Sequence, residues 1–228
     1  PELSLTGVPE NNKIYMVKNP ENSGLTGLGE EGYYMYIGDN GSNSTVANRI
    51  SITADHETGA YWSTRTILQA MMEDEENHTI RMGYTRDYPL YRVRGIILDV
   101  GRKTFTMDYL QQMAKQMAWY KMNDFQIHLN DNYIFLEEYS RDGADPMDAY
   151  AAFRLESDVK EGGNNGLNKA DLTAKDVFYT KDEFRDFIQT SRKMGVNIVP
   201  EIDTPAHSLA FTKVRPDLRN GTYGREND

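Results

Sequence analysis

Three short stretches of the sequence carry side chains that can move protons or hold a polar ligand. The first pairs a carboxylate with a guanidinium, at Asp99 and Arg102. The other two combine imidazoles with carboxylates, the usual groups for general acid–base catalysis near neutral pH. These two clusters consist of His128, Asn130 and Asp131 in one case, and of Glu201, Asp203 and His207 in the other.

Ordinary structural roles exist for most of these residues, and the residue types alone leave both interpretations open. Asp99 and Arg102 could form an ion pair that anchors a loop. His128 alternates with apolar neighbours, as a histidine packed in a core or an interface does. Asp131 could cap a loop, and Asp203 could be the N-cap of a helix.

Hydrophobic patterning predicts the elements that position the clusters. Residues 93–100 are almost continuously apolar, which is typical of a strand buried on both faces of a parallel sheet. Residues 124–130 and 196–202 predict two more strands. Helices are expected at residues 108–118, from the capping box Thr180-Lys181-Asp182-Glu183 to Gly195, and after Pro205.

This strand and helix order predicts the opening third of a (β/α)8 barrel, in which reactive groups lie at the carboxyl ends of the strands. His207 would then begin a helix that faces the barrel mouth, where a histidine has few good packing roles. Residues 131–179 form a polar connection far longer than the usual loop of about two to six residues. A complete barrel needs about 250 residues, so we expect this chain to be a portion of a longer protein.

The first part of the chain has a different pattern and predicts a smaller α+β domain. Strands are expected at residues 33–37, 49–54 and 79–84, with a helix from Thr58 onward. We expect an antiparallel sheet covered by that helix. Pro89 marks a natural boundary, so the domains are expected at residues 1–90 and 91–228.

Composition excludes several classes of function. The formal net charge of −10 disfavours a nucleic-acid partner, because most of the surface would repel phosphate. The absence of cysteine excludes disulfides, thiolate metal sites and cysteine nucleophiles. No apolar run approaches the roughly 18 to 20 residues of a membrane span, so we expect no membrane span, and the cellular compartment stays open on composition alone.

Three motifs together resemble glycoside hydrolase family 20, the β-N-acetylhexosaminidases and their relatives such as lacto-N-biosidases. They are RGIILDVGRK at residues 94–103, YKMNDFQIHLND at 120–131 and VPEIDTPAHSLAF at 199–211. Residues 30–90 also resemble the small domain that precedes the barrel in this family. One departure is Ala206, which stands where the family has glycine and could require a different backbone at that turn.

The resemblance implies roles for individual residues. Arg94 would hydrogen-bond the 3- and 4-hydroxyls of a terminal N-acetylhexosamine. Asp131 and His207 would form a relay behind the general acid, a way to keep a carboxylic acid able to donate a proton near neutrality. The remaining strand-end residues are expected to support the site from nearby, and they are Asp99, Arg102, Glu201 and Asp203.

The mechanism implied is substrate-assisted retention, in which the substrate's own 2-acetamido oxygen attacks C1. The resemblance places the Asp-Glu pair of this mechanism at the end of a fourth strand, after residue 228, so the chain alone is expected to be inactive. Two Asp-Glu pairs do occur within the chain. We interpret Asp74-Glu75 as a solvated run and Asp182-Glu183 as a helix cap.

The resemblance further implies a glycan substrate, the rest of the same barrel as a partner, no cofactor or metal, and a bacterial exported or cell-surface protein. Two other functions stay open. One is a non-catalytic carbohydrate-binding or scaffold fragment. The other is a metal-dependent barrel hydrolase, whose ligands would be His128, Asp131, Glu201, Asp203 and His207.

Overall fold

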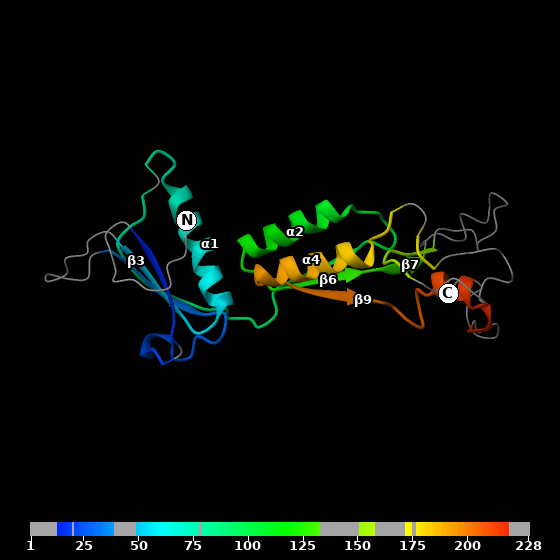
Figure 1. Cartoon of the computed structure of the whole chain (residues 1–228), viewed down its shortest axis with the longest axis horizontal. Helices are drawn as coiled ribbons and strands as arrows, with labels where there is room; N and C mark the ends of the chain where they lie inside the picture. The colour runs from blue at the N-terminus through cyan, green and yellow to red at the C-terminus, as the bar shows by residue number, and fades with distance from the viewer. Residues whose placement is uncertain are drawn as a thin grey trace. The chain divides into compact units, whose positions relative to one another are not determined.

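The computed structural model describes residues 13–19, 21–38, 49–77, 79–132, 151–157, 172–174 and 177–218. The chain divides into two compact units, which Figure 1 shows with their elements labelled. The first unit comprises residues 1–94, 118–122 and 193–195, and the second comprises residues 95–117, 123–192 and 196–228. None of the helices described is long and apolar enough to span a bilayer.

The first unit contains a four-stranded sheet in the order β1-β3-β2-β4 with the helix α1 against it. β2 pairs antiparallel with β3 and β4, as expected for the strands predicted from sequence. β1, which was not among the predicted strands, pairs parallel with β3, so the sheet is mixed and the expectation of a purely antiparallel sheet was wrong. The strand expected at residues 79–84 instead begins at Gly83. The bounds are β1 Ile14–Lys18, β2 Tyr33–Gly38, β3 Arg49–Ala54, α1 Glu57–Glu73 and β4 Gly83–Asp87, with a 3-10 turn at Ser23–Leu25.

In the second unit, three parallel strands form a sheet in the order β5-β6-β9. Helices α2 and α4 lie on the same face of this sheet (Figure 1). The ring of Phe125 on β6 meets Phe187 of α4 edge to face, with ring centroids 6.3 Å apart. The bounds are β5 Gly95–Asp99, α2 Met107–Trp119, β6 Asp124–His128, α4 Lys181–Lys193, β9 Asn197–Glu201, α5 Leu209–Val214 and a 3-10 turn at Pro216–Leu218.

The two faces of this sheet have different surroundings. Phe125 and Ile127 are fully buried on the helix-covered face. Side chains alternate along a strand, so Ile97 and Val199 point to the opposite face, where they are 66% and 37% exposed. The strand ends carry the candidate residues on this second, open face.

The long connection after β6 is partly ordered into strands. β7 (Asn130–Asn132) pairs antiparallel with β8 (Ala151–Phe153), and bridges join Phe153 to Thr173 and Leu155 to Tyr179. The strand expected at residues 124–130 therefore ends at His128, and Asn130 starts a separate ladder. The glycine-rich stretch at residues 162–166 lies outside the described residues.

The capping box expected at the start of α4 is confirmed. The Thr180 backbone N–H donates to Glu183 Oε2 at 3.0 Å, and the Glu183 backbone N–H donates to Thr180 Oγ1 at 3.1 Å. These bonds satisfy two donors that a helix start otherwise leaves unpaired. Gly195 follows the helix with a φ of 75°, a left-handed conformation that glycine adopts without strain.

Candidate active site

Strand register brings three candidate residues into one row. Asp99, His128 and Glu201 are the last residues of β5, β6 and β9, and they are neighbours across the parallel ladder. Their side chains therefore leave the same face of the sheet at its carboxyl end. This is the arrangement that the strand-end clusters of the sequence predicted.

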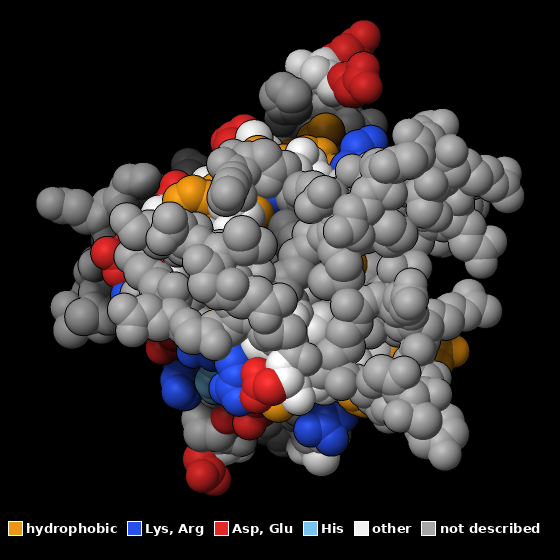
Figure 2. Space-filling view, turned by 90° about the vertical axis from the view of Figure 1, so that its right-hand side faces the viewer, with side chains coloured by type: hydrophobic (Ala, Val, Ile, Leu, Met, Phe, Trp, Pro, Cys, Tyr) orange, Lys and Arg blue, Asp and Glu red, His pale blue; other side chains and the backbone are white. Residues whose placement is uncertain are grey.

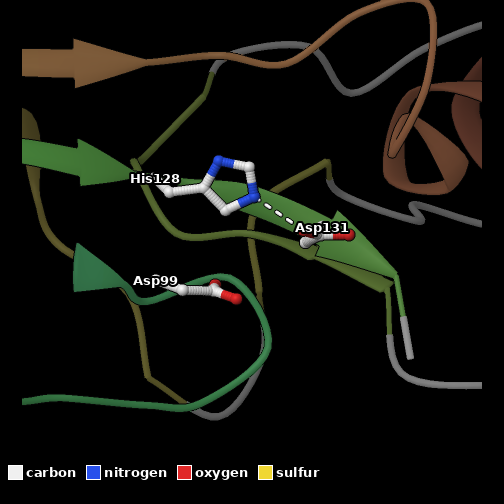
Figure 3. A group of neighbouring side chains, drawn as sticks. All are labelled: Asp99, His128 and Asp131. Carbon is white, nitrogen blue, oxygen red and sulfur yellow. Dashed lines mark hydrogen bonds and ion pairs between the residues drawn. The ribbon is translucent and has the colours of Figure 1, made fainter. Parts of the chain in front are cut away.

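Asp131 is the centre of the site and is 1% exposed. Its Oδ2 atom lies 2.7 Å from Nε2 of His128, as Figure 3 shows, and 2.7 Å from a terminal nitrogen of Arg102. Its Oδ1 atom lies 2.8 Å from Nδ1 of His207 and accepts the Asn132 backbone N–H at 2.6 Å. Three side chains that can carry positive charge thus surround one buried carboxylate.

Arg102 joins two carboxylates at the rim. Besides Asp131, it contacts Asp99 Oδ2 at 2.8 Å, and its Nε–H donates to the carbonyl of Asn132 at 3.3 Å. Its side chain remains 32% exposed, so the guanidinium also faces the open side. The loop before it needs Gly101, because a Cβ there would lie 2.8 Å from the backbone nitrogen of Asp131.

The loop between β9 and α5 holds His207. Its φ of 55° is the left-handed region, which is uncommon for a residue with a side chain, and the positive φ falls on His207 and not on Ala206. The amide of Asn130 fixes this loop by donating to the carbonyls of His207 at 2.9 Å and Asp203 at 3.1 Å. Asn130 Oδ1 also accepts the Asp203 backbone N–H at 3.0 Å.

Asn132 anchors the start of α5, because its Oδ1 accepts the Leu209 backbone N–H at 3.0 Å. Sequence reasoning missed the loop-holding roles of Asn130 and Asn132. The available signal was the pair of amides flanking Asp131, since side-chain amides often hold irregular backbone.

Hydrogen bonds and neighbouring charges shift the pKa values of two side chains in the site, His128 and Glu201. Burial of the ring lowers the pKa of His128, but hydrogen bonds to Asp131 and Glu201 raise it by more, and the pKa lies above its ordinary value. The hydrogen bond from Gln126 holds the pKa of Glu201 below its usual range, against the effect of burial and with help from His128. Both shifts favour the charged forms of the pair.

These residues line an open cavity of about 270 Å³ on the uncovered face of the sheet. Figure 2, which looks onto the right-hand side of Figure 1, toward which β6 and β9 point, shows basic, acidic and histidine side chains at the surface. Every candidate from the sequence lines the cavity except Arg94 and Asn130. The lining consists of Ile97, Asp99, Arg102, Gln126, His128, Asp131, Glu201, Asp203 and His207.

Arg94 lies just before the first residue of β5, whereas the cavity is at the other end of that strand. Its guanidinium forms an ion pair with Glu31 and donates to the carbonyls of Lys121 and Tyr91, both at 2.8 Å. Its side chain is mostly buried within the first unit. The structure therefore places Arg94 apart from the other candidate residues.

Among the residues that the structure describes, two sets of ligand atoms are close enough together for a cation, with all atoms of a set within 4.8 Å of one another. The first is Asp99, His128 and Asp131, and Arg102 already neutralises both of its carboxylates. The second shares His128, whose ring nitrogens both contact carboxylates. A metal ion would have to displace these cationic partners, so the donor sets fit a cation poorly.

Comparison with known proteins assigns the family. Residues 91–228 match the sequence model described as the catalytic domain of glycosyl hydrolase family 20. The chain belongs to this family, and its neighbours among solved structures have the family's α/β barrel fold. The uncovered sheet face and the strand-end cavity agree with that fold, in which the carboxyl ends of the strands carry the site.

Curated relatives include the β-hexosaminidase of Vibrio furnissii, 28% identical over 168 residues, which are 74% of this chain and 26% of that protein. The β-hexosaminidase of Porphyromonas gingivalis is 26% identical over 201 residues, 84% of this chain and 22% of that protein. The chain thus spans about a quarter of the length of these relatives.

Among solved structures, the exo β-N-acetylglucosaminidase of Vibrio harveyi, in complex with N-acetylglucosamine, superposes with a TM-score of 0.62. It is 26% identical, with 92% of this chain and 30% of that chain covered. The β-N-acetylhexosaminidase of Bacteroides fragilis gives a TM-score of 0.65 at 20% identity, over 92% of this chain and 44% of that chain.

Proposed function

We propose that the protein of which this chain is a part removes terminal β-linked N-acetylhexosamine from glycans by substrate-assisted retention. The observation that carries the proposal is the buried carboxylate of Asp131, which holds Nδ1 of His207 at 2.8 Å beside the strand-end cavity. A carboxylate that orients an imidazole toward a reacting group is a recurrent device of acid–base catalysis.

In this mechanism, Asp131 and His207 support the general acid and do not touch the sugar. Because Asp131 takes Nδ1 of His207, the Nε2 atom of the same half-exposed ring is the group that bonds the acid. The acid protonates the leaving oxygen while the substrate's acetamido oxygen attacks C1. The imidazole thereby keeps the acid oriented and suitably protonated near neutral pH.

Arg102 is the group we propose to anchor the sugar hydroxyls, in the place that the family resemblance gave to Arg94. Its guanidinium lines the cavity and has five N–H donors, of which the contacts to Asp99, Asp131 and Asn132 use three. The partly exposed carboxylate of Asp99 can accept a hydroxyl beside it. Arg94 is already engaged with Glu31.

The Asp-Glu pair of the mechanism comes, in our proposal, from another part of the protein. Asp74 follows α1 as its C-cap and accepts the Asn77 backbone N–H. Glu183 belongs to the capping box of α4. Both pairs of this chain thus serve helix ends, so we propose that the chain by itself does not turn over substrate.

The test is hydrolysis of a chromogenic N-acetyl-β-hexosaminide by the complete protein, with the matching β-glucoside, which lacks the acetamido group, as the control substrate. We expect turnover of the first with retention at C1, and none of the second. Equal hydrolysis of both substrates, or inversion, would contradict the substrate-assisted mechanism. Turnover by the purified 228-residue chain would contradict the assignment of the acid pair.

A metal-dependent hydrolase is the second candidate, because the ligand atoms of two sets of described residues lie within 4.8 Å of one another, although Arg102 and His128 already contact their carboxylates. Metal analysis and chelation of the complete protein separate the two proposals. We expect activity to survive a chelator. A stoichiometric divalent ion whose removal abolishes turnover would support the metal mechanism instead.

A further inference from the structure

Four ionisable side chains lie in a line along the cavity, and carboxylates alternate with imidazoles. Glu201 Oε2 lies 3.0 Å from Nδ1 of His128, whose Nε2 lies 2.7 Å from Oδ2 of Asp131. Asp131 Oδ1 then reaches Nδ1 of His207 at 2.8 Å. His128 is the largely buried inner member of this line and has no role in the family relay of Asp131 and His207 described above.

The protonation state of His128 follows from its two partners. Ionised carboxylate oxygens only accept hydrogen bonds. Both ring nitrogens of His128 face carboxyl oxygens, so when Glu201 and Asp131 are both ionised both nitrogens must donate, and the ring is then an imidazolium. Hydrogen bonds between charged partners are about twice as strong as neutral ones, so this ring holds both carboxylates firmly.

The surrounding charges explain why the cation is needed. Asp99 on β5 and Asp131 share the guanidinium of Arg102. Glu201 on β9 has the ring of His128 as its cationic partner, and a carboxylate oxygen of Asp203 also lies within 4.8 Å of a nitrogen of that ring. The ring centroids of His128 and His207 are 6.4 Å apart. A neutral His128 would turn one lone pair toward a carboxylate, so either Glu201 or Asp131 would lose its bond.

We infer that His128 is a positioning residue for the relay: as an imidazolium it links Glu201 to Asp131 and fixes the Asp131 carboxylate so that Oδ1 faces His207. This inference rests on the proposed function and adds Glu201 and His128 to its machinery. The pKa of His128, which lies above its ordinary value, agrees with a ring that stays charged near neutral pH. Loss of its proton then weakens catalysis at alkaline pH.

The first test compares the pH dependence of kcat in the complete protein with an NMR titration of ¹⁵N-labelled histidine. Glu201→Gln keeps an acceptor for Nδ1 but removes the charge. We expect the His128 midpoint and the alkaline fall of kcat to move together to lower pH, with KM almost unchanged. A midpoint that moves while the kcat profile stays fixed would overturn the positioning role.

A second variant, His128→Gln, keeps a neutral donor and removes the titration. We expect kcat to fall by roughly 10²-fold, the usual cost of a misplaced catalytic group, and the His207 titration to shift. His56→Gln is the matched control, because His56 caps α1 in the other unit, and it should give the wild-type profile. Wild-type kcat in His128→Gln would contradict the proposal, as would ¹⁵N shifts of a neutral His128 ring at pH of about 6.5.

The NMR signals also separate the positioning role of His128 from the proposed hydrolase function. If the complete protein does not hydrolyse N-acetylhexosaminides, the proposed function fails, but the link from His128 through Asp131 to His207 is still tested. In that case His128→Gln must shift the titration of His207. An unchanged His207 titration would overturn the inference by itself.

Discussion

The Nδ1 atom of His207 lies 2.8 Å from Oδ1 of Asp131. This contact joins the loop after β9 to β7, the strand that follows β6. Replacing His207 with Ala in the complete protein should lower kcat by roughly 10² to 10⁴, the scale of general acid catalysis, while KM changes little. His207→Asn serves as a matched control, since its amide can still reach Asp131 but cannot also bond the acid. Steady-state kinetics measure kcat in both variants. Wild-type kcat in both would contradict a role of His207 in the mechanism.

Arg102 and Arg94 should respond differently to the same substitution. Arg102→Ala should raise KM for the N-acetyl-β-hexosaminide, because a cavity donor is lost, with kcat falling where that bond strengthens in the transition state. Arg94→Ala should leave KM near wild type and lower the free energy of unfolding by about 1–3 kcal/mol, because the ion pair with Glu31 and the bonds to the carbonyls of Lys121 and Tyr91 are lost. Kinetics and urea unfolding measure both effects. The opposite pattern would return the sugar-binding role to Arg94.

The expectations from sequence succeeded where local pattern is sufficient. The spacing Thr180 to Glu183 carries its own hydrogen bonds, and strand-end residues of a parallel sheet meet because the strands share a direction. The sequence therefore predicted the capping box and the row formed by Asp99, His128 and Glu201.

Tertiary contacts decided what the sequence could not predict. The parallel pairing of β1 with β3 depends on a partner distant in sequence, and the apolar stretch of residues 14–17 specifies no direction. The amides of Asn130 and Asn132 acquire their roles only when the loop after β9 folds against β7. Arg94 was assigned through the resemblance alone, whereas spacing had already placed Arg102 at a strand end.

Because of His128, the free energy of unfolding should decrease at alkaline pH. Its folded-state pKa is raised above the ordinary value of about 6.5, so its contribution to stability is fully present below that value. The contribution is lost as pH rises through the folded-state pKa. Urea unfolding at several pH values should show a smaller loss above neutrality in His128→Gln than in the wild type. If the free energy of unfolding fell equally with rising pH in both proteins, the raised pKa of His128 would be contradicted.

The capping box should contribute to the stability of α4. Thr180→Ala removes the hydroxyl that accepts the Glu183 N–H and should lower the free energy of unfolding by about 0.5–2 kcal/mol. Thr190→Ala is the matched control, since this exposed threonine lies late in the same helix and should change stability little. Chemical denaturation gives both values. A control that costs as much as Thr180→Ala would exclude the cap as the cause.

A double-mutant cycle on Asp131 and His207 in the complete protein tests the central claim most directly. Residues that act as one catalytic unit are strongly non-additive. With kcat measured on a chromogenic N-acetyl-β-hexosaminide, Asp131→Asn and His207→Ala should each cause a large loss. The double variant should then lose little more than the worse single variant. Losses that multiply as independent effects would contradict a relay formed by these two residues.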